Sequence, residues 1–148
     1  LGSLEELESA PALSSPRALG WHLNLNYRVG VEVFHHEFAE AIAALGDPDL
    51  VIVDIRDIRE RQRSGVIPGS VHAPRGMIEF WVDPDSPYHK PVFAQEGKRY
   101  LFHCASGWRS ALTVAALQEM GFEAAHLRDG FTDWVAQGGA VEQLPPRE

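Results

Sequence analysis

The sequence predicts an α/β fold, in which a mostly parallel central sheet carries helices on both faces. Apolar runs that suit buried strands alternate along the chain with stretches of helical periodicity. The strand candidates are residues 50–55, 98–103 and 124–127, and the helix candidates that follow them are 57–62, 110–120 and 131–136. In such sheets the functional loops follow the carboxyl ends of the strands, so we expect the site there.

The composition is that of one soluble globular domain. The 148 residues are 45% hydrophobic and 23% charged, which suffices for a sizeable core. A net charge of -8 argues against nucleic acid as a partner, because sequence-independent binding needs a basic surface. No apolar run approaches the roughly 18 residues of a membrane span, so no membrane partner is expected. The single cysteine excludes an internal disulfide and favours a reducing, cytoplasmic setting.

The N-terminal part differs from the rest of the chain. Serines and prolines recur there and periodicity is weak, so we expect a flexible or frayed segment at 1–20 and one domain at 21–148. Apolar residues then alternate with polar ones, which predicts a strand or an arm that docks on the domain. These apolar residues are Trp21, Leu23, Leu25 and Tyr27.

A short strand and a helix come next. Residues 31–33 suit a strand, and residues 35–45 have the apolar spacing of a helix. His35 and His36 could be metal ligands, but no cluster of cysteines or carboxylates supports them. We therefore predict that the pair begins the helix in solvent and that the protein holds no metal.

Residues 50–55 are nearly all apolar, as in a strand buried on both faces, and residues 57–62 form a short charged helix. Charged side chains here allow two interpretations, an ion-pair network beneath the active loop or solvated surface charge. The residues concerned are Asp54, Arg56, Glu60 and Arg61. In the first case, Asp54 and Arg56 give structural support to the loop.

The remaining elements are delimited by glycine and proline. A turn at 67–69 leads to a short strand at 70–73, and a helix at 76–82 ends in a proline-containing stretch. Gly121 ends the helix at 110–120, and the pair Gly138-Gly139 ends the last one.

The main chemical signal is the segment 104–110, which joins the strand at 98–103 to the helix that follows. The first N–H groups of a helix lack partners, and its N-terminus is positive, so both favour Cys104 as thiolate. Arg109 adds a permanently charged guanidinium, which can donate two hydrogen bonds to one anion. Gly107 permits a backbone turn that other residues resist. We predict that Cys104 is the nucleophile and that substrate is bound by Ala105, Ser106, Gly107, Trp108, Arg109 and Ser110.

This segment resembles the active-site loop of rhodanese-type sulfurtransferases, which often reads Cys-x-x-Gly-x-Arg-Ser. The residues that match are Cys104, Gly107, Arg109 and Ser110. Residues 51–56 look like the family strand that ends in Asp-x-Arg, and 65–70 resemble its Gly-His-Ile-Pro-Gly-Ala motif. Residues 127–134 resemble its closing Leu-x-Gly-Gly…Trp pattern. The resemblance spans about 31–141, with Val66 in place of a histidine and Asp129 in place of a glycine.

The resemblance implies a single-domain, three-layer rhodanese-like fold without a cofactor. It also implies a reaction in which Cys104 takes sulfane sulfur from a small anionic donor such as thiosulfate and becomes a persulfide. Because the chain has no second cysteine, the acceptor would be external: a thiol, cyanide or a protein.

Two other functions remain open at this stage. His103, Cys104 and Arg109 echo the His-Cys-x5-Arg pattern of tyrosine phosphatases, which would give a phosphatase or an arsenate reductase. Only four residues separate Cys104 from Arg109, and this smaller loop suits one sulfur atom better than a phosphate. The third possibility is a non-catalytic binding module, whose usual mark is loss of the nucleophile, yet Cys104 is present.

Overall fold

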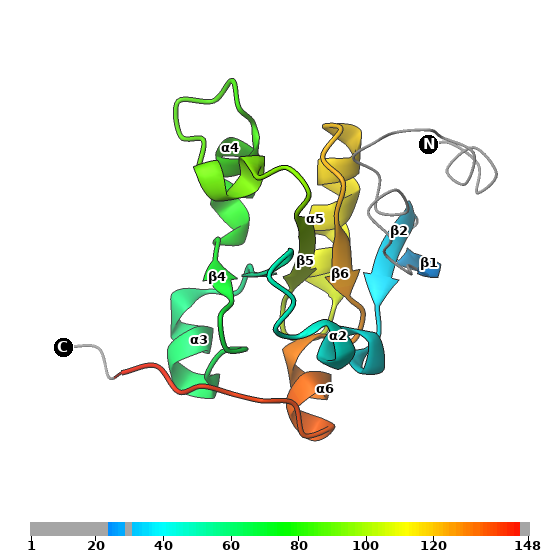
Figure 1. The fold of residues 1–148 in the computed structure, drawn as a ribbon, viewed down its shortest axis with the longest axis vertical. Helices are drawn as coiled ribbons and strands as arrows, with labels where there is room; N and C mark the ends of the chain where they lie inside the picture. The colour runs from blue at the N-terminus through cyan, green and yellow to red at the C-terminus, as the bar shows by residue number, and fades with distance from the viewer. Residues whose placement is uncertain (1–23, 29–30, 146–148) are drawn as a thin grey trace.

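The computed structural model describes residues 24–28 and 31–145, and its centre is a six-stranded sheet. The strands are β1 (Asn24–Arg28), β2 (Val31–His36), β3 (Leu50–Asp54), β4 (Val71–His72), β5 (Arg99–His103) and β6 (Ala125–Leu127). Their order is β1-β2-β6-β5-β3-β4, with β1 antiparallel to β2 and all other neighbours parallel (Figure 1). The predicted α/β class with a mostly parallel sheet is therefore confirmed. The segment 1–20, which we expected to be flexible, lies outside the described residues.

Strand β1 decides between the two predictions for the alternating N-terminal segment. It pairs with β2 from Asn24, opposite His35, to Arg28, opposite Val31. The part at 24–28 is therefore an edge strand of the sheet, while Trp21 and Leu23 lie outside the described residues.

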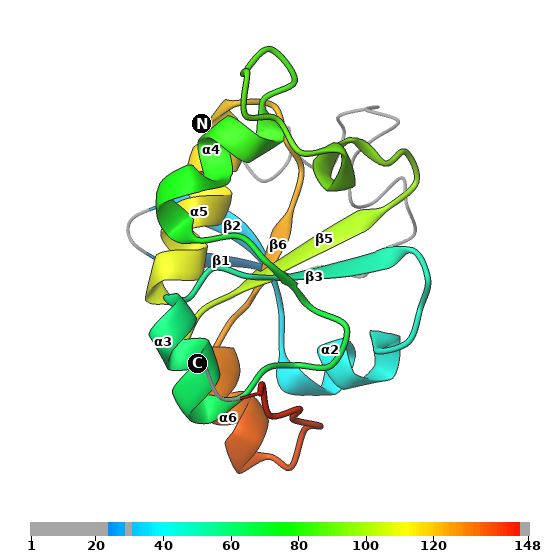
Figure 2. The same cartoon turned by 90° about the vertical axis from the view of Figure 1, so that its left-hand side faces the viewer.

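Helices cover both faces of the sheet and give the fold three layers. Figure 2 shows α4 and α5 on one side of the sheet and α2, α3 and α6 on the other. Their bounds are α2 (Phe38–Ala44), α3 (Ile58–Ser64), α4 (Ile78–Val82), α5 (Trp108–Glu119) and α6 (Gly130–Ala136), with 3-10 turns at Arg75–Met77 and Pro91–Ala94. Neighbouring residues of β5 point to opposite faces, so Phe102 joins the core under α5 and Leu101 the core that contains Trp134 of α6.

The helix predicted to start at His35 begins later, at Phe38, and this changes the setting of two histidines. His35 and His36 belong to β2 and are 4% and 3% exposed, so the prediction of a solvated pair is wrong. The helix begins after Glu37 because Glu37 and Glu40 form a reciprocal capping box. Burial disfavours the charged imidazolium and lowers the pKa of both histidines.

Strands β3 and β5 form the centre of the sheet and end together. They pair in register from Leu50 beside Arg99 to Asp54 beside His103, and Cys104 follows immediately. The carboxyl ends of these strands thus bring the predicted support residues and the predicted nucleophile to one edge of the sheet. Figure 1 shows the starts of α5 and α6 near the end of β5. Among the residues that the structure describes, no helix has the length and apolar character needed to cross a bilayer.

Candidate active site

Cys104 lies in a tight loop between β5 and α5, with backbone donors aimed at its sulfur. The N–H of Gly107 is 3.2 Å from Sγ, and that of Ser110 is 3.3 Å away. These donors are available because they lie at the start of α5, where the helix offers them no carbonyl. Gly107, the residue before α5, has φ 94°, a left-handed conformation that favours glycine. Both N–H groups are thus placed to donate to the sulfur, and the thiolate that we predicted from the sequence stays a prediction.

The sulfur is enclosed. Cys104 is only 1% exposed, whereas Trp108, at the first position of α5, is 55% exposed. Ser106 is also exposed, and Ala105 is half-buried. Of the loop residues predicted from the sequence, Gly107 and Ser110 thus contact the sulfur, whereas Trp108 lies at the outer surface. This enclosure favours a small reagent over a large one in any direct attack by the sulfur.

The first turn of α6 holds the outer side of the loop. The N–H of Phe131 donates to the Cys104 carbonyl at 2.8 Å, and that of Thr132 donates to the Ala105 carbonyl at 3.0 Å. This close approach needs Gly130, because a Cβ there would lie 2.4 Å from the Ala105 oxygen. Asp129, by contrast, has φ -104°, which any residue adopts, so its departure from the family glycine leaves the backbone undisturbed.

Arg109 is anchored to a carboxylate. Its two terminal nitrogens donate to the two oxygens of Glu60 in α3, at 2.7 and 2.9 Å. These two hydrogen bonds lower the pKa of Glu60 and raise the pKa of Arg109. Cys104, which lies nearby, makes a smaller contribution to the raised pKa of Arg109. The structure therefore gives Arg109 the role of linking α5 to α3, and its predicted contact with a bound anion stays a prediction.

Of the four charged residues with two interpretations, Asp54, Arg56 and Arg61 form a buried ion-pair network, whereas Glu60 pairs with Arg109. Asp54 accepts from Arg56 Nε at 3.0 Å and from Arg61 Nε at 3.1 Å. Burial alone would raise the pKa of Asp54, but the hydrogen bonds from Arg56 outweigh it, and the pKa falls below its usual value. Arg56 also donates to the Gly65 carbonyl at 2.7 Å, and its guanidinium lies 4.1 Å from the centre of the Phe131 ring. Asp54 and Arg56 thus connect the β3 end to the helix that holds the loop.

The balance of charge in this network is positive. Two guanidiniums share the single carboxylate of Asp54, and His103, in register with Asp54, has its pKa lowered by complete burial. One positive charge is therefore left over next to the strand end that carries Cys104. Its sign is opposite to that of the overall net charge of -8.

Sequence reasoning missed one residue of the site, His126 on β6. It is fully buried, and its Nδ1 lies 2.9 Å from Ser110 Oγ, which in turn lies 3.5 Å from Cys104 Sγ. The available signal was a histidine in the middle of an otherwise apolar three-residue strand. Such a residue needs a polar partner, but spacing alone does not say that the partner is Ser110.

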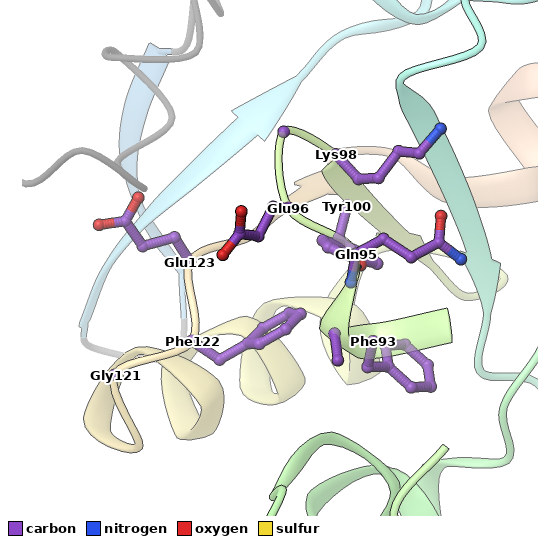
Figure 3. A pocket seen from close by; sticks show the side chains of 10 residues that line it. Phe93, Gln95, Glu96, Lys98, Tyr100, Gly121, Phe122 and Glu123 are labelled. Carbon is purple, nitrogen blue, oxygen red and sulfur yellow. Dashed lines mark hydrogen bonds between the residues drawn. The ribbon is translucent and has the colours of Figure 1, made fainter. Parts of the chain in front are cut away.

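A cavity of about 560 Å³ lies elsewhere, at the opposite end of β5 from Cys104. Figure 3 shows its aromatic lining, Phe93, Tyr100 and Phe122, together with Glu96 and Glu123. Its lining shares no residue with the Cys104 loop, so its volume says nothing about the chemistry at Cys104. Within the described ranges, no three His, Cys, Asp or Glu side chains gather as metal ligands would.

The fold and this loop agree with a comparison with known families. A family model described as "Rhodanese-like domain" matches residues 37–137, more than half of the chain. The chain belongs to the rhodanese-like family. The match covers β3, the Cys104 loop and α6, so the three parts of the site lie within it.

Known rhodanese-like proteins resemble this chain at modest identity. The Bacillus subtilis protein YtwF, named as a candidate sulfurtransferase, is 32% identical over 91 residues, which are 62% of this chain and 79% of that one. A mouse protein, thiosulfate sulfurtransferase/rhodanese-like domain-containing protein 3, is 26% identical over 103 residues, 66% of each chain. The rhodanese-like chain thus spans just under two thirds of this mouse relative.

A solved structure is more similar in sequence and carries a different description. It comes from Rhodopseudomonas palustris and is 49% identical, with a TM-score of 0.71, over 74% of this chain and 85% of its own. That protein is described as being of unknown function and a possible tyrosine phosphatase. The names of these relatives thus point to two chemistries, sulfur transfer and phosphate hydrolysis.

Proposed function

We propose that this protein is a rhodanese-type sulfurtransferase that works through a persulfide on Cys104. The Cys104 thiolate attacks the outer sulfur of a small anionic donor such as thiosulfate. A sulfur–sulfur bond to Cys104 forms while the one in the donor breaks, and its electron pair leaves with sulfite. The observation that carries the proposal is the convergence of the Gly107 and Ser110 N–H groups on Sγ, within 3.3 Å.

The second step needs an acceptor from outside the chain, because Cys104 is the only cysteine. A persulfide places its terminal sulfur about 2 Å beyond Sγ, since that is the length of a sulfur–sulfur bond. This terminal sulfur is the atom to be transferred. Cyanide, a small thiol or a protein thiol attacks it, and the Cys104 thiolate returns. No cofactor takes part in either step.

The description of the Rhodopseudomonas palustris relative favours phosphatase activity as a second candidate. The loop length speaks against it, because only four residues lie between Cys104 and Arg109, one fewer than in the phosphatase pattern. Arg109, which would have to hold a phosphate, is engaged with both oxygens of Glu60. Asp54 is paired with Arg56 and Arg61 and has a lowered pKa, so it is a poor general acid.

Turnover of the wild-type chain on two substrates in one buffer tests this choice. The first assay supplies thiosulfate and cyanide and measures thiocyanate, and the second supplies an aryl phosphate and measures the phenol. We expect thiocyanate formation and negligible phosphate hydrolysis. Efficient hydrolysis without thiocyanate would replace the sulfurtransferase proposal by the phosphatase one.

A further inference from the structure

The Ser110 hydroxyl lies between the sulfur of Cys104 and a buried imidazole. Its oxygen is 3.5 Å from Sγ on one side and 2.9 Å from His126 Nδ1 on the other. Ser110 and His126 are both fully buried, and Cys104 is nearly so. The three side chains thus form a continuous polar line from the loop to the middle of the sheet.

This arrangement is not the default for a serine near a helix start. Ser and Thr hydroxyls within a helix commonly donate to the carbonyl four residues earlier. Thr113, in the next turn of α5, does so and donates to the Arg109 carbonyl at 2.8 Å. The Ser110 hydroxyl instead faces His126, and this partner keeps it directed along the line to the sulfur.

His126 is flanked by two strands and one helix. The register of β6 places it beside His35 of β2 and Phe102 of β5, and α5 contributes Ser110. The ring of His35 meets that of His126 edge-on, with centroids 6.5 Å apart. Burial lowers the pKa of His35 and thus disfavours a positive charge beside His126.

We propose that His126 is a positioning residue, which holds the Ser110 hydroxyl against Cys104 Sγ and thereby favours the thiolate. A hydroxyl can accept from the thiol and donate to the thiolate, and Nδ1 can accept or donate according to its tautomer. In the thiolate state, the Ser110 O–H adds a third donor to the two backbone N–H groups. The inference deepens the proposed sulfurtransferase function, since it concerns the nucleophile of that reaction.

The pH profile of Cys104 alkylation by iodoacetamide tests the inference without any sulfur donor. The variants are His126→Phe, Ser110→Ala and their double mutant, with thermal unfolding as the check of folding. His35→Phe is the matched control, because His35 is equally a buried strand histidine on the same face but lies on the far side of His126 from β5. His126→Asn keeps a hydrogen-bonding atom close to the Nδ1 position and serves if the Phe variant does not fold.

We expect His126→Phe to move the midpoint of the alkylation profile upward by about one pH unit, which corresponds to about 1.4 kcal/mol. Ser110→Ala should move it at least as far, and the double mutant no further than Ser110→Ala, because one residue acts through the other. His126→Asn should recover at least half of the shift, and His35→Phe should leave the midpoint in place.

Three results would overturn the inference. The first is a midpoint that does not shift in His126→Phe, and the second is a shift caused by His126→Phe that is equally large in the Ser110→Ala background. The third is a folded His126→Asn variant whose midpoint moves by a full pH unit. Failure of the proposed function looks different. In that case thiosulfate leaves no sulfur on the wild type, while the alkylation profiles still separate the variants.

Discussion

At the scale of single residues, Gly130 lets two backbones meet at the site. It has φ +73°, and a Cβ would lie 2.4 Å from the Ala105 oxygen, 2.5 Å from its carbonyl carbon and 2.8 Å from the Ser106 nitrogen. The carbonyls of Cys104 and Ala105 can accept from α6 only at this separation. The shape of the Cys104 loop therefore depends on a residue 26 positions further along the chain.

Gly130→Ala should destabilise the protein more than Gly138→Ala. Both positions have positive φ, but a Cβ at Gly138 meets nothing within 4 Å. Gly138→Ala, the control, should therefore lower the free energy of unfolding only by the strain of the left-handed backbone, about 1–3 kcal/mol. Gly130→Ala should lower it by about 1–3 kcal/mol more, because its Cβ also clashes with the Ala105 backbone. Urea unfolding of both variants measures the difference, and equal losses would mean that the Ala105 backbone moves aside freely.

A second residue-scale prediction separates charge from anchoring at Arg109. Lysine keeps the charge but cannot fork onto Glu60, so Arg109→Lys should resemble Arg109→Ala, with kcat/KM for thiosulfate reduced about threefold to tenfold. The stability loss should stay below about 1 kcal/mol, because Arg109 is partly exposed. Arg59→Lys is the control, because Arg59 lies on α3 as Glu60 does and forms an exposed ion pair with Asp57. This substitution should change neither kcat/KM nor the free energy of unfolding.

Steady-state assays on the Arg109 variants decide the point. Wild-type kcat/KM in Arg109→Lys, together with a large loss in Arg109→Ala, would show that the charge itself matters. That result would return Arg109 to the anion-binding role predicted from the sequence.

At the scale of elements, the sequence predicted the strands and helices that have strong local signals. The strand predicted at 50–55 is β3, which ends one residue earlier, at Asp54. The Cys104 loop lies between β5 and α5, as expected. Histidine has no strong preference between helix and strand, and the pairing of β2 with β6 extends the strand through His36. That pairing is a tertiary contact, so local periodicity placed the helix start too early.

Contacts between distant elements limited the prediction of the site in the same way. Glu60 and Arg109 are 49 residues apart, and Ser110 and His126 are 16 apart. The chemistry of each residue was visible in the sequence, but its partner was set by how α3, α5 and β6 pack. Val66, which departs from the family histidine, is buried and pairs its backbone with Glu142, another contact that its own motif does not reveal.

For the whole molecule, the buried titratable groups predict a loss of stability in weak acid. Burial lowers the pKa of His35, His36 and His103 below the ordinary value of about 6.5, so unfolding takes up protons. The free energy of unfolding should therefore decrease as the pH falls below about 6.5. A second decrease should begin below about pH 4, because Asp54 and Glu60 have lowered pKa values and lose their pairs when protonated.

Urea unfolding between pH 8 and 3 measures both steps. The slope in the first step has an upper limit of about 1.4 kcal/mol per pH unit for each histidine. A free energy of unfolding that stays constant between pH 7 and 5 would mean that these histidines are as easily protonated in the folded state as in the unfolded one.

The central claim is that Cys104 accepts a sulfur atom, and the intact mass of the protein after incubation with thiosulfate tests it most directly. The account predicts that the wild type gains the mass of one sulfur atom and loses it again when cyanide is added. Cys104→Ser should gain nothing while it unfolds at a temperature close to that of the wild type, since a serine hydroxyl is hardly ionised and forms no persulfide. An unchanged mass of the folded, reduced wild type, or a gain of sulfur by Cys104→Ser, would contradict the account.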